Sequence, residues 1–203
     1  SITDSYFYGD LILTKNTVFR DGRFYFYNFT GTHDLIVDAQ VYFMENVGDI
    51  SKPSKITAKG EVNFKCDFVN TTGNQLYSQM ALLYNDVSIN TNEGNGNVVF
   101  ESFVECNDKP YSLELDVGSG NVTFNDSVGD DLYTMRDIVV NDVQDLDIKA
   151  DFHAQSFTQN AGTGTTDLGL TSLNLSTGPA IIMGNDVVGN ITAGALSLKV
   201  KTA

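Results

Sequence analysis

Apolar and polar residues alternate with period two along most of this chain. Residues 35–43 place Leu, Val, Ala, Val and Phe at every second position, and residues 111–117 and 146–154 repeat the pattern. Because successive side chains of a strand point to opposite faces, each segment predicts a strand with one buried face. Such alternation is typical of antiparallel sheets with one face in water.

Clusters of Gly, Asn and Asp separate these segments at short intervals. They lie at residues 21–22, 92–97, 118–120, 129–131, 162–164 and 184–186. The pair Asp21-Gly22, between Val18-Phe19 and Phe24-Tyr25, predicts a tight hairpin. About a dozen short strands with such links predict an all-β, antiparallel β-sandwich or flattened barrel.

One segment has a competing pattern. Leu76, Tyr77, Met80, Leu83, Tyr84 and Val87 follow a helical stripe, which Thr72 or Asn74 is placed to cap. The sequence leaves open whether residues 74–86 form a short helix or strands.

The chain is long enough to bury a core as one domain. It has 203 residues, 41% of them apolar, so we expect a single all-β domain over 1–203. Its two ends differ in chemistry. Nine of the 22 aromatic residues lie in the first 29 positions, in expected strands over 5–29, whereas the expected strands over 158–203 contain none.

The aromatic N-terminal segment has two interpretations. It is either an ordinary edge of the core, since Phe and Tyr favour strands, or a segment that adds a strand to the sheet of a neighbouring subunit. The sequence does not decide between them.

Two cysteines, Cys66 and Cys106, both fall on the buried face of an expected strand. In an extracellular protein this pattern predicts one disulfide. The alternative is two buried free thiols. A zinc site would need four ligands, which two cysteines without CxxC spacing and two histidines do not supply.

Six Asn-x-Ser/Thr motifs predict N-glycosylation and therefore an extracellular, secreted or cell-surface location. They begin at Asn28, Asn70, Asn121, Asn125, Asn174 and Asn190. The alternation places Asn121, Asn125, Asn174 and Asn190 on outward positions, and Asn70 at a strand end. The chain begins with Ser1 and has no early apolar run with a basic flank, so we expect any signal peptide to have been removed.

The charge balance bears on partners. The net charge is −14, and no dense Lys/Arg cluster is present, which argues against a nucleic-acid partner. No apolar stretch approaches the roughly 18 residues needed to span a bilayer. We expect a soluble, acidic protein.

Chemistry has few candidate residues. His33 and His153 lie in polar surroundings without a nucleophile motif, and no phosphate-binding, dinucleotide or metalloprotease motif occurs, so we expect no enzyme activity and no catalytic or cofactor-binding residue. Calcium is the one cofactor with candidate ligands, of which Asp126, Asp130 and Asp131 are the closest group. Solvated turn residues explain the same group.

These observations predict a secreted, glycosylated, non-enzymatic structural or adhesive protein. It would assemble with copies of itself, as a filament or surface layer, by edge-strand pairing or N-terminal strand donation. The alternative is a secreted carrier of a small apolar ligand in a β-lined cavity. If the glycans are present, contacts between copies would favour the aromatic end, up to about residue 27.

Overall fold

The computed structural model describes residues 3–175, 179–183, 186–192 and 195–199, and beyond Gly169 only the side chains of Leu175 and Asp186. Regular structure in this part of the chain consists of strands alone, and every pairing between them is parallel. The strands are β1 (Asp4–Leu13), β2 (Thr17–Gly31), β3 (Asp34–Phe43), β4 (Lys55–Ala58), β5 (Val62–Phe64), β6 (Phe68–Asn70), β7 (Gln75–Tyr77), β8 (Ala81–Leu83), β9 (Val87–Asn90), β10 (Val98–Phe100), β11 (Val104–Cys106), β12 (Leu113–Asp116), β13 (Val122–Phe124), β14 (Met135–Val140), β15 (Leu146–Ile148), β16 (Phe152–Gln159), β17 (Thr165–Leu175), β18 (Pro179–Met183), β19 (Asp186–Thr192) and β20 (Ala195–Lys199).

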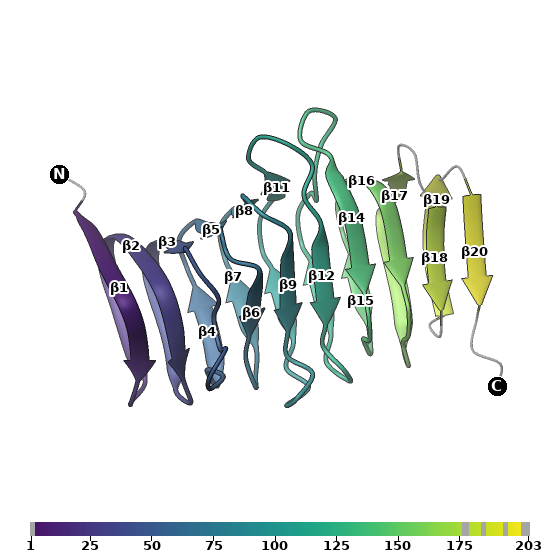
Figure 1. The fold of residues 1–203 in the computed structure, drawn as a ribbon. Coiled ribbons are helices and arrows are strands. Elements are labelled where there is room, and N and C mark those ends of the chain that lie inside the picture. Colours follow the sequence, from purple (N-terminus) through teal and green to yellow (C-terminus); the bar gives the residue numbers. More distant parts are fainter. Residues whose placement is uncertain (1–2, 176–178, 184–185, 193–194, 200–203) are drawn as a thin grey trace.

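The chain winds as a coil whose successive turns stack on one another. Figure 1 shows the stack running from β1 at one end to β20 at the other. Each strand pairs with the strand one turn later, so that β4 pairs with β7, β7 with β10 and β10 with β13. About eight turns build a parallel β-solenoid.

Three columns of paired strands form three faces of the coil. Face A contains β4, β7, β10, β13 and β15. Face B contains β5, β8 and β11, and the first halves of β1 and β16 extend it. Face C contains β6, β9, β12 and β14. The long strands β2 and β3 bend around corners and contribute to more than one face.

Buried side chains occur in pairs two residues apart, one pair for each face. In one turn these pairs are Gln75 with Tyr77, Ala81 with Leu83, and Val87 with Ile89. The residue between each pair points outward, and corner residues connect one face to the next. The alternation thus buries one side of every strand inside the coil.

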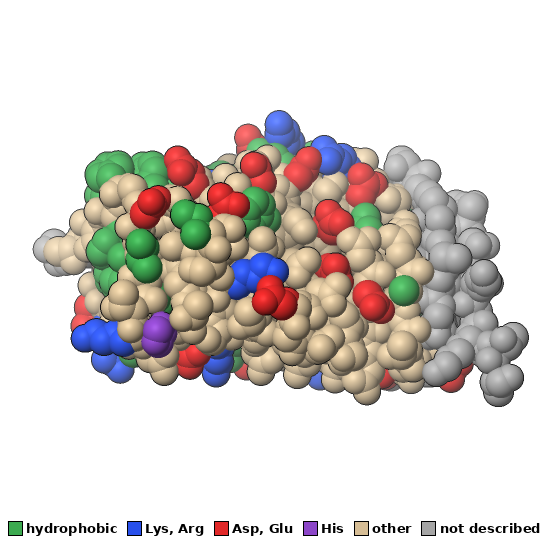
Figure 2. Space-filling view, turned by 60° about the horizontal axis from the view of Figure 1, so that its bottom comes forward, with side chains coloured by type: hydrophobic (Ala, Val, Ile, Leu, Met, Phe, Trp, Pro, Cys, Tyr) green, Lys and Arg blue, Asp and Glu red, His purple; other side chains and the backbone are tan. Residues whose placement is uncertain are grey.

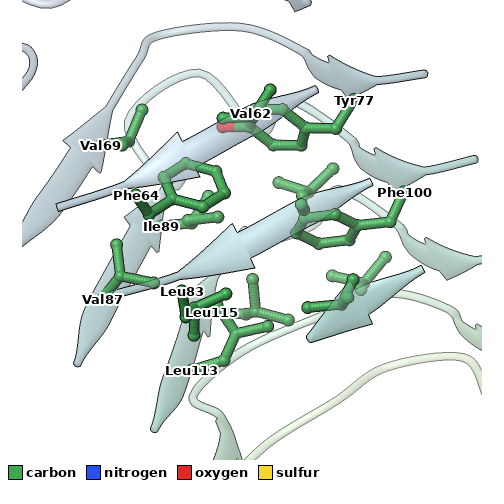
Figure 3. Packing of buried hydrophobic residues seen from close by; sticks show 14 of the residues in the cluster. Val62, Phe64, Val69, Tyr77, Leu83, Val87, Ile89, Phe100, Leu113 and Leu115 are labelled. Atoms are coloured by element: carbon green, nitrogen blue, oxygen red, sulfur yellow. The ribbon is translucent and has the colours of Figure 1, made fainter. Parts of the chain in front are cut away.

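Rings stack along the axis of the coil. Phe64 meets Tyr77, Tyr77 meets Phe100, and Phe100 meets Phe124, with centroids 5.1–5.3 Å apart. Figure 3 shows Phe64, Tyr77 and Phe100 among the aliphatic side chains between the faces. Each buried ring contributes about 1.5–3 kcal/mol, and each ring pair about 0.5–1.5 kcal/mol more.

Polar side chains connect the turns at the corner before face A. The Oδ1 atom of Asn74 accepts a hydrogen bond from the backbone N–H of Asn97, Asn97 does the same for Asn121, and Asn121 for Asp145, over 2.9–3.1 Å. Asp145 continues the series to Thr165. This asparagine ladder satisfies backbone N–H groups at the corner that have no strand partner.

The predicted antiparallel β-sandwich or flattened barrel is wrong, because the strands pair in parallel. Period-two alternation reports only that one face of a strand is buried, and this holds equally for the short parallel strands of a coil. The Asp21-Gly22 hairpin is also wrong, because a turn-forming pair permits a corner as well as a chain reversal. Both residues lie inside β2, with φ of 60° and 148°, where the pairing with β3 shifts register between Arg20 and Arg23. They bend the strand around a corner instead of reversing it.

The helix considered at residues 74–86 does not form. This segment contains β7 and β8, with Tyr77 and Leu83 buried, while Met80 lies at the corner between them. Two three-residue strands separated by a three-residue corner give apolar spacings that resemble a helical stripe. The competing strand interpretation is the one the structure supports.

The predicted disulfide is also wrong, since Cys66 and Cys106 are both buried free thiols. Phe64 pairs with Leu83, and Leu83 pairs with Cys106, so the two cysteines lie two turns apart. With about 4.8 Å between neighbouring strands, this separation of about 9–10 Å exceeds the roughly 7 Å limit between the Cα atoms of a disulfide.

Candidate functional site at the N-terminal edge

Strand β1 forms the N-terminal end of the coil. It pairs with β2 along one edge, from Asp4 with Arg23 to Leu13 with Gly31. No described strand pairs with its other edge, and Figure 1 shows β1 outermost in the stack. An open strand edge presents unpaired N–H and C=O groups that another strand can bind.

Three of the eight exposed large apolar side chains among the described residues lie on this strand. Tyr6 is 47% exposed, Tyr8 73% and Ile12 58%. Figure 2 shows hydrophobic side chains gathered at this end of the molecule, while acidic side chains are dispersed along the rest of the visible face. We call Asp4–Leu13, with these three side chains, the open end.

The tyrosines form a stacked ladder on the outside of face B. Tyr6 stacks on Tyr25 with centroids 4.3 Å apart, and Tyr25 stacks on Tyr42 at 4.4 Å. Lys65 closes the far side of the ladder, with its ammonium 5.8 Å from the Tyr42 ring. The other side ends at Tyr6, which no further strand covers. Both faces of Tyr25 are therefore occupied, whereas Tyr6 contacts Tyr25 on one side and its neighbour Tyr8, 5.7 Å away, and its side chain stays 47% exposed.

The interior of the coil is also incompletely covered at this end. Phe7 and Leu11 point inward but are only partly buried, because no turn lies above them. Phe7 packs against Phe19 and Phe26, with centroids 5.3 Å from each. The open end thus presents a cross-section of the hydrophobic core, which repeat proteins normally shield with a capping element.

Both carboxylates of the open end, Asp4 and Asp10, have a side-chain partner. Asp4 forms an ion pair with Arg23 at 3.5 Å, and Asp10 accepts a hydrogen bond from Asn28 at 2.5 Å. Desolvation among neighbouring groups raises the pKa of Tyr6, and the charge that Tyr25 would carry raises it further. Tyr6 therefore stays neutral at ordinary pH.

The structure places four of the six sequons. Asn125 is exposed, and its Oδ1 accepts a hydrogen bond from Lys149. Asn121 belongs to the asparagine ladder, Asn28 donates to Asp10, and Asn70 ends β6 in a half-buried position. The side chains of Asn174 and Asn190 lie outside the described residues. Glycosylation stays a prediction, and Asn125 is the described sequon most open to a glycan.

The candidate calcium ligands are occupied by local hydrogen bonds. Asp126 accepts from the N–H of Ser127, and Asp130 from the N–H groups of Leu132 and Tyr133. Asp131 lies 3.3 Å from His153. Within the described ranges, no three acidic, histidine or cysteine side chains are grouped to hold a metal ion. His33 contacts the carbonyl oxygen of Leu13 at 3.2 Å.

Two surface hollows were not foreseen from the sequence. One, of about 260 Å³, is lined by Asn28, Met44, Glu45, Asn46, Asp49, Lys65, Cys66 and Asp67. The other, of about 280 Å³, is lined by Thr32, Gly48, Asp49, Ile50, Ser51, Lys52, Thr72 and Glu93. Most lining residues in both are polar or charged, which suits water or a small polar solute. The residues that line each hollow come from neighbouring turns of the coil. The sequence could have predicted that they lie together only if the number of residues in each turn were known.

No helix among the described residues is long and apolar enough to cross a membrane. Comparison with protein-family models, curated proteins and solved structures finds no match to this chain.

Proposed function

We propose that this chain is a secreted, non-enzymatic structural or adhesive protein that associates with copies of itself through its open end. The uncovered β1 edge carries this proposal, because strand edge, exposed aromatic side chains and incompletely buried core coincide there. A lone surface tyrosine needs no explanation, but an uncapped end of a stacked sheet is a known route to association.

The architecture suits a structural role. Each turn binds the next through backbone hydrogen bonds, the asparagine ladder and the column of rings, so the coil forms a regular stack. Edge pairing would extend that stack by the same interactions. The dispersed acidic surface supports specificity, since like charges disfavour contact along the sides and leave the end as the favoured place.

A carrier of apolar ligands receives less support. The interior contains the ring column and aliphatic side chains, and most residues that line the two hollows described above are polar or charged. No observation favours an enlarged apolar cavity. The acidic composition likewise disfavours a nucleic-acid partner.

The test compares the mass of the protein in solution across concentrations, by light scattering after size exclusion. We expect the unmodified chain to form assemblies, and the double variant Tyr8→Lys, Ile12→Lys to be monomeric, because lysines on an edge oppose pairing. The control is Ile50→Lys, since Ile50 is 74% exposed and lies outside β1. It should assemble normally. An unmodified chain that is monomeric at every concentration overturns the proposal.

The proposed compartment has its own test. Expression through a eukaryotic secretory pathway, followed by enzymatic deglycosylation in heavy-oxygen water and peptide mapping, should label Asn125. Absence of label at all six sequons would contradict the prediction of glycosylation, while leaving assembly untouched.

A further inference from the structure

The two ends of the coil differ in a way that selects how copies meet. β1 presents Tyr6, Phe7 and Tyr8, whereas no aromatic residue follows Phe157, so β17 to β20 contain none. Joining the N-terminal end of one copy to the C-terminal end of another would place a strand without rings over Tyr6. Joining two N-terminal ends places rings on rings, so that aromatic stacking adds to the burial of apolar surface at the joint.

We propose that the open end is covered by the same end of a second copy, with Asp4–Tyr8 of each chain paired antiparallel about a two-fold axis near Tyr6. This inference rests on the proposed function and specifies its partner. A two-fold axis gives an isologous interface, in which one self-complementary patch serves both copies.

Side chains on the two faces of the segment fit this symmetry. An axis at Tyr6, perpendicular to face B, keeps outer side chains outside and inner ones inside. The two Tyr6 rings then meet at the axis and extend both tyrosine ladders into one. Phe7 of each copy lies opposite the inward, small Ser5 of the other, so that large and small side chains alternate over the exposed core.

Charges also fit this register. Asp4 lies opposite Tyr8 of the second copy, not another acid, and Arg23 already neutralises it at 3.5 Å. Asp10 lies beyond Gly9, where φ is 83° and the register with β2 shifts, so it falls outside the paired segment. The net charge of −14 is therefore not concentrated at the joint.

Cysteine cross-linking tests the register. Residues directly opposite in an antiparallel pair have Cβ atoms about 4.5–5.5 Å apart, near enough for a disulfide with small adjustments. Tyr6→Cys should therefore form a covalent dimer under mild oxidation. Ile50→Cys, which is more exposed than Tyr6 and lies outside β1, is the control. Cys66 and Cys106 are 2% and 1% exposed and should not compete.

The expected difference in cross-linking rate between Tyr6→Cys and Ile50→Cys follows from the local concentration of the thiols. Held together at the axis, the two thiols experience a millimolar effective concentration, so micromolar Tyr6→Cys should cross-link on the order of 100-fold faster than Ile50→Cys. A second measurement keeps Tyr6 intact. Equal amounts of Asp4→Cys and Tyr8→Cys chains, mixed and oxidised, should give mixed dimers in excess over either homodimer.

The outcomes separate the two proposals. An unmodified chain that never associates overturns self-assembly, and this inference with it. A chain that associates while Tyr6→Cys and the Asp4/Tyr8 mixture cross-link no faster than Ile50→Cys overturns the two-fold joint alone. If the chain forms growing filaments and these cysteine variants still cross-link no faster than Ile50→Cys, the N-terminal end of one copy pairs with the C-terminal end of the next.

Discussion

Asn97 and Asn121 lie one turn apart, and the side-chain Oδ1 of Asn97 accepts a hydrogen bond from the backbone N–H of Asn121 at 2.9 Å. The same relationship joins Asn74 to Asn97 and Asn121 to Asp145, with sequence separations of 23 and 24 residues. The ladder thus binds successive turns at a corner where strand pairing is interrupted.

Removing one member of the ladder should destabilise the fold. Asn97→Ala deprives the Asn121 N–H of its acceptor, and we expect the free energy of unfolding to fall by about 1–2 kcal/mol. Urea denaturation followed by circular dichroism measures it. Asn107→Ala, at an exposed corner outside the ladder, is the control and should change stability by less than about 0.5 kcal/mol. An equal decrease in the free energy of unfolding in both variants would show that the ladder hydrogen bond does not stabilise the fold more than an ordinary surface side chain does.

The corner beside the ladder requires glycine at position 96. A Cβ atom on Gly96 would lie 2.3 Å from the carbonyl carbon of Gly73, and one on Gly120 would lie 2.5 Å from the carbonyl oxygen of Gly96. Gly96→Ala should therefore force the turns apart and cost about 1–3 kcal/mol. Ser119→Ala, at the exposed corner one turn later, should be nearly neutral. The melting temperatures of the two variants provide the comparison, and an unchanged value for Gly96→Ala would contradict the close stacking.

Both native thiols should be inert in the folded protein. Burial raises the pKa of Cys66 from 9.0 to about 12 and that of Cys106 to about 11. Because the thiolate is the reactive form, a thiol reagent at pH 8 should label neither cysteine until denaturant is added, and should then label both. Mass spectrometry after mild oxidation should also show no intramolecular disulfide. Rapid labelling without denaturant would indicate that the coil opens at these turns.

Alkaline pH should weaken the tyrosine ladder. Desolvation, and after it the charge that its neighbour Tyr25 would carry, raise the pKa of Tyr42 from 10.0 to about 12. A raised pKa in the folded state means that the contribution to stability is complete below pH 10 and is lost as pH rises toward 12. Unfolding measured at pH 9 and pH 11 should therefore show a smaller loss for Tyr42→Phe than for the unmodified chain. Identical losses would exclude Tyr42 as a source of the pH dependence.

Much of the local structure could be predicted from the alternation. Residues 35–43 and 113–116 are strands, with Leu35, Val37 and Val41 buried as expected. The Gly and Asn clusters at 92–97 and 118–120 do interrupt strands, but as corners of a coil. What failed was the inference from turn residues to chain reversal, because Gly and Asn permit both a hairpin and a corner.

The repeat escaped detection because its length varies. Residues stacked one turn apart are separated by 18 positions for Asn16 and Asp34, by 24 for Asn97 and Asn121, and by 20 for Asp145 and Thr165. Because the corners differ in length by a few residues, the number of residues per turn changes along the chain, and the sequence shows no fixed period. The backbone tolerates this because only the short strands must keep their register.

The sequence by itself determined that alternating segments such as 35–43 form strands, which side of these strands is buried, that both cysteines lie inside, and that the two ends differ in chemistry. These properties follow from local alternation and composition. Only the tertiary structure decided that the strands pair in parallel, that Cys66 and Cys106 lie two turns apart, and that Tyr6, Tyr25 and Tyr42 form one ladder ending at an open edge. Period-two alternation records the burial of a strand but not its partner, and that partner depends on how many residues each corner takes.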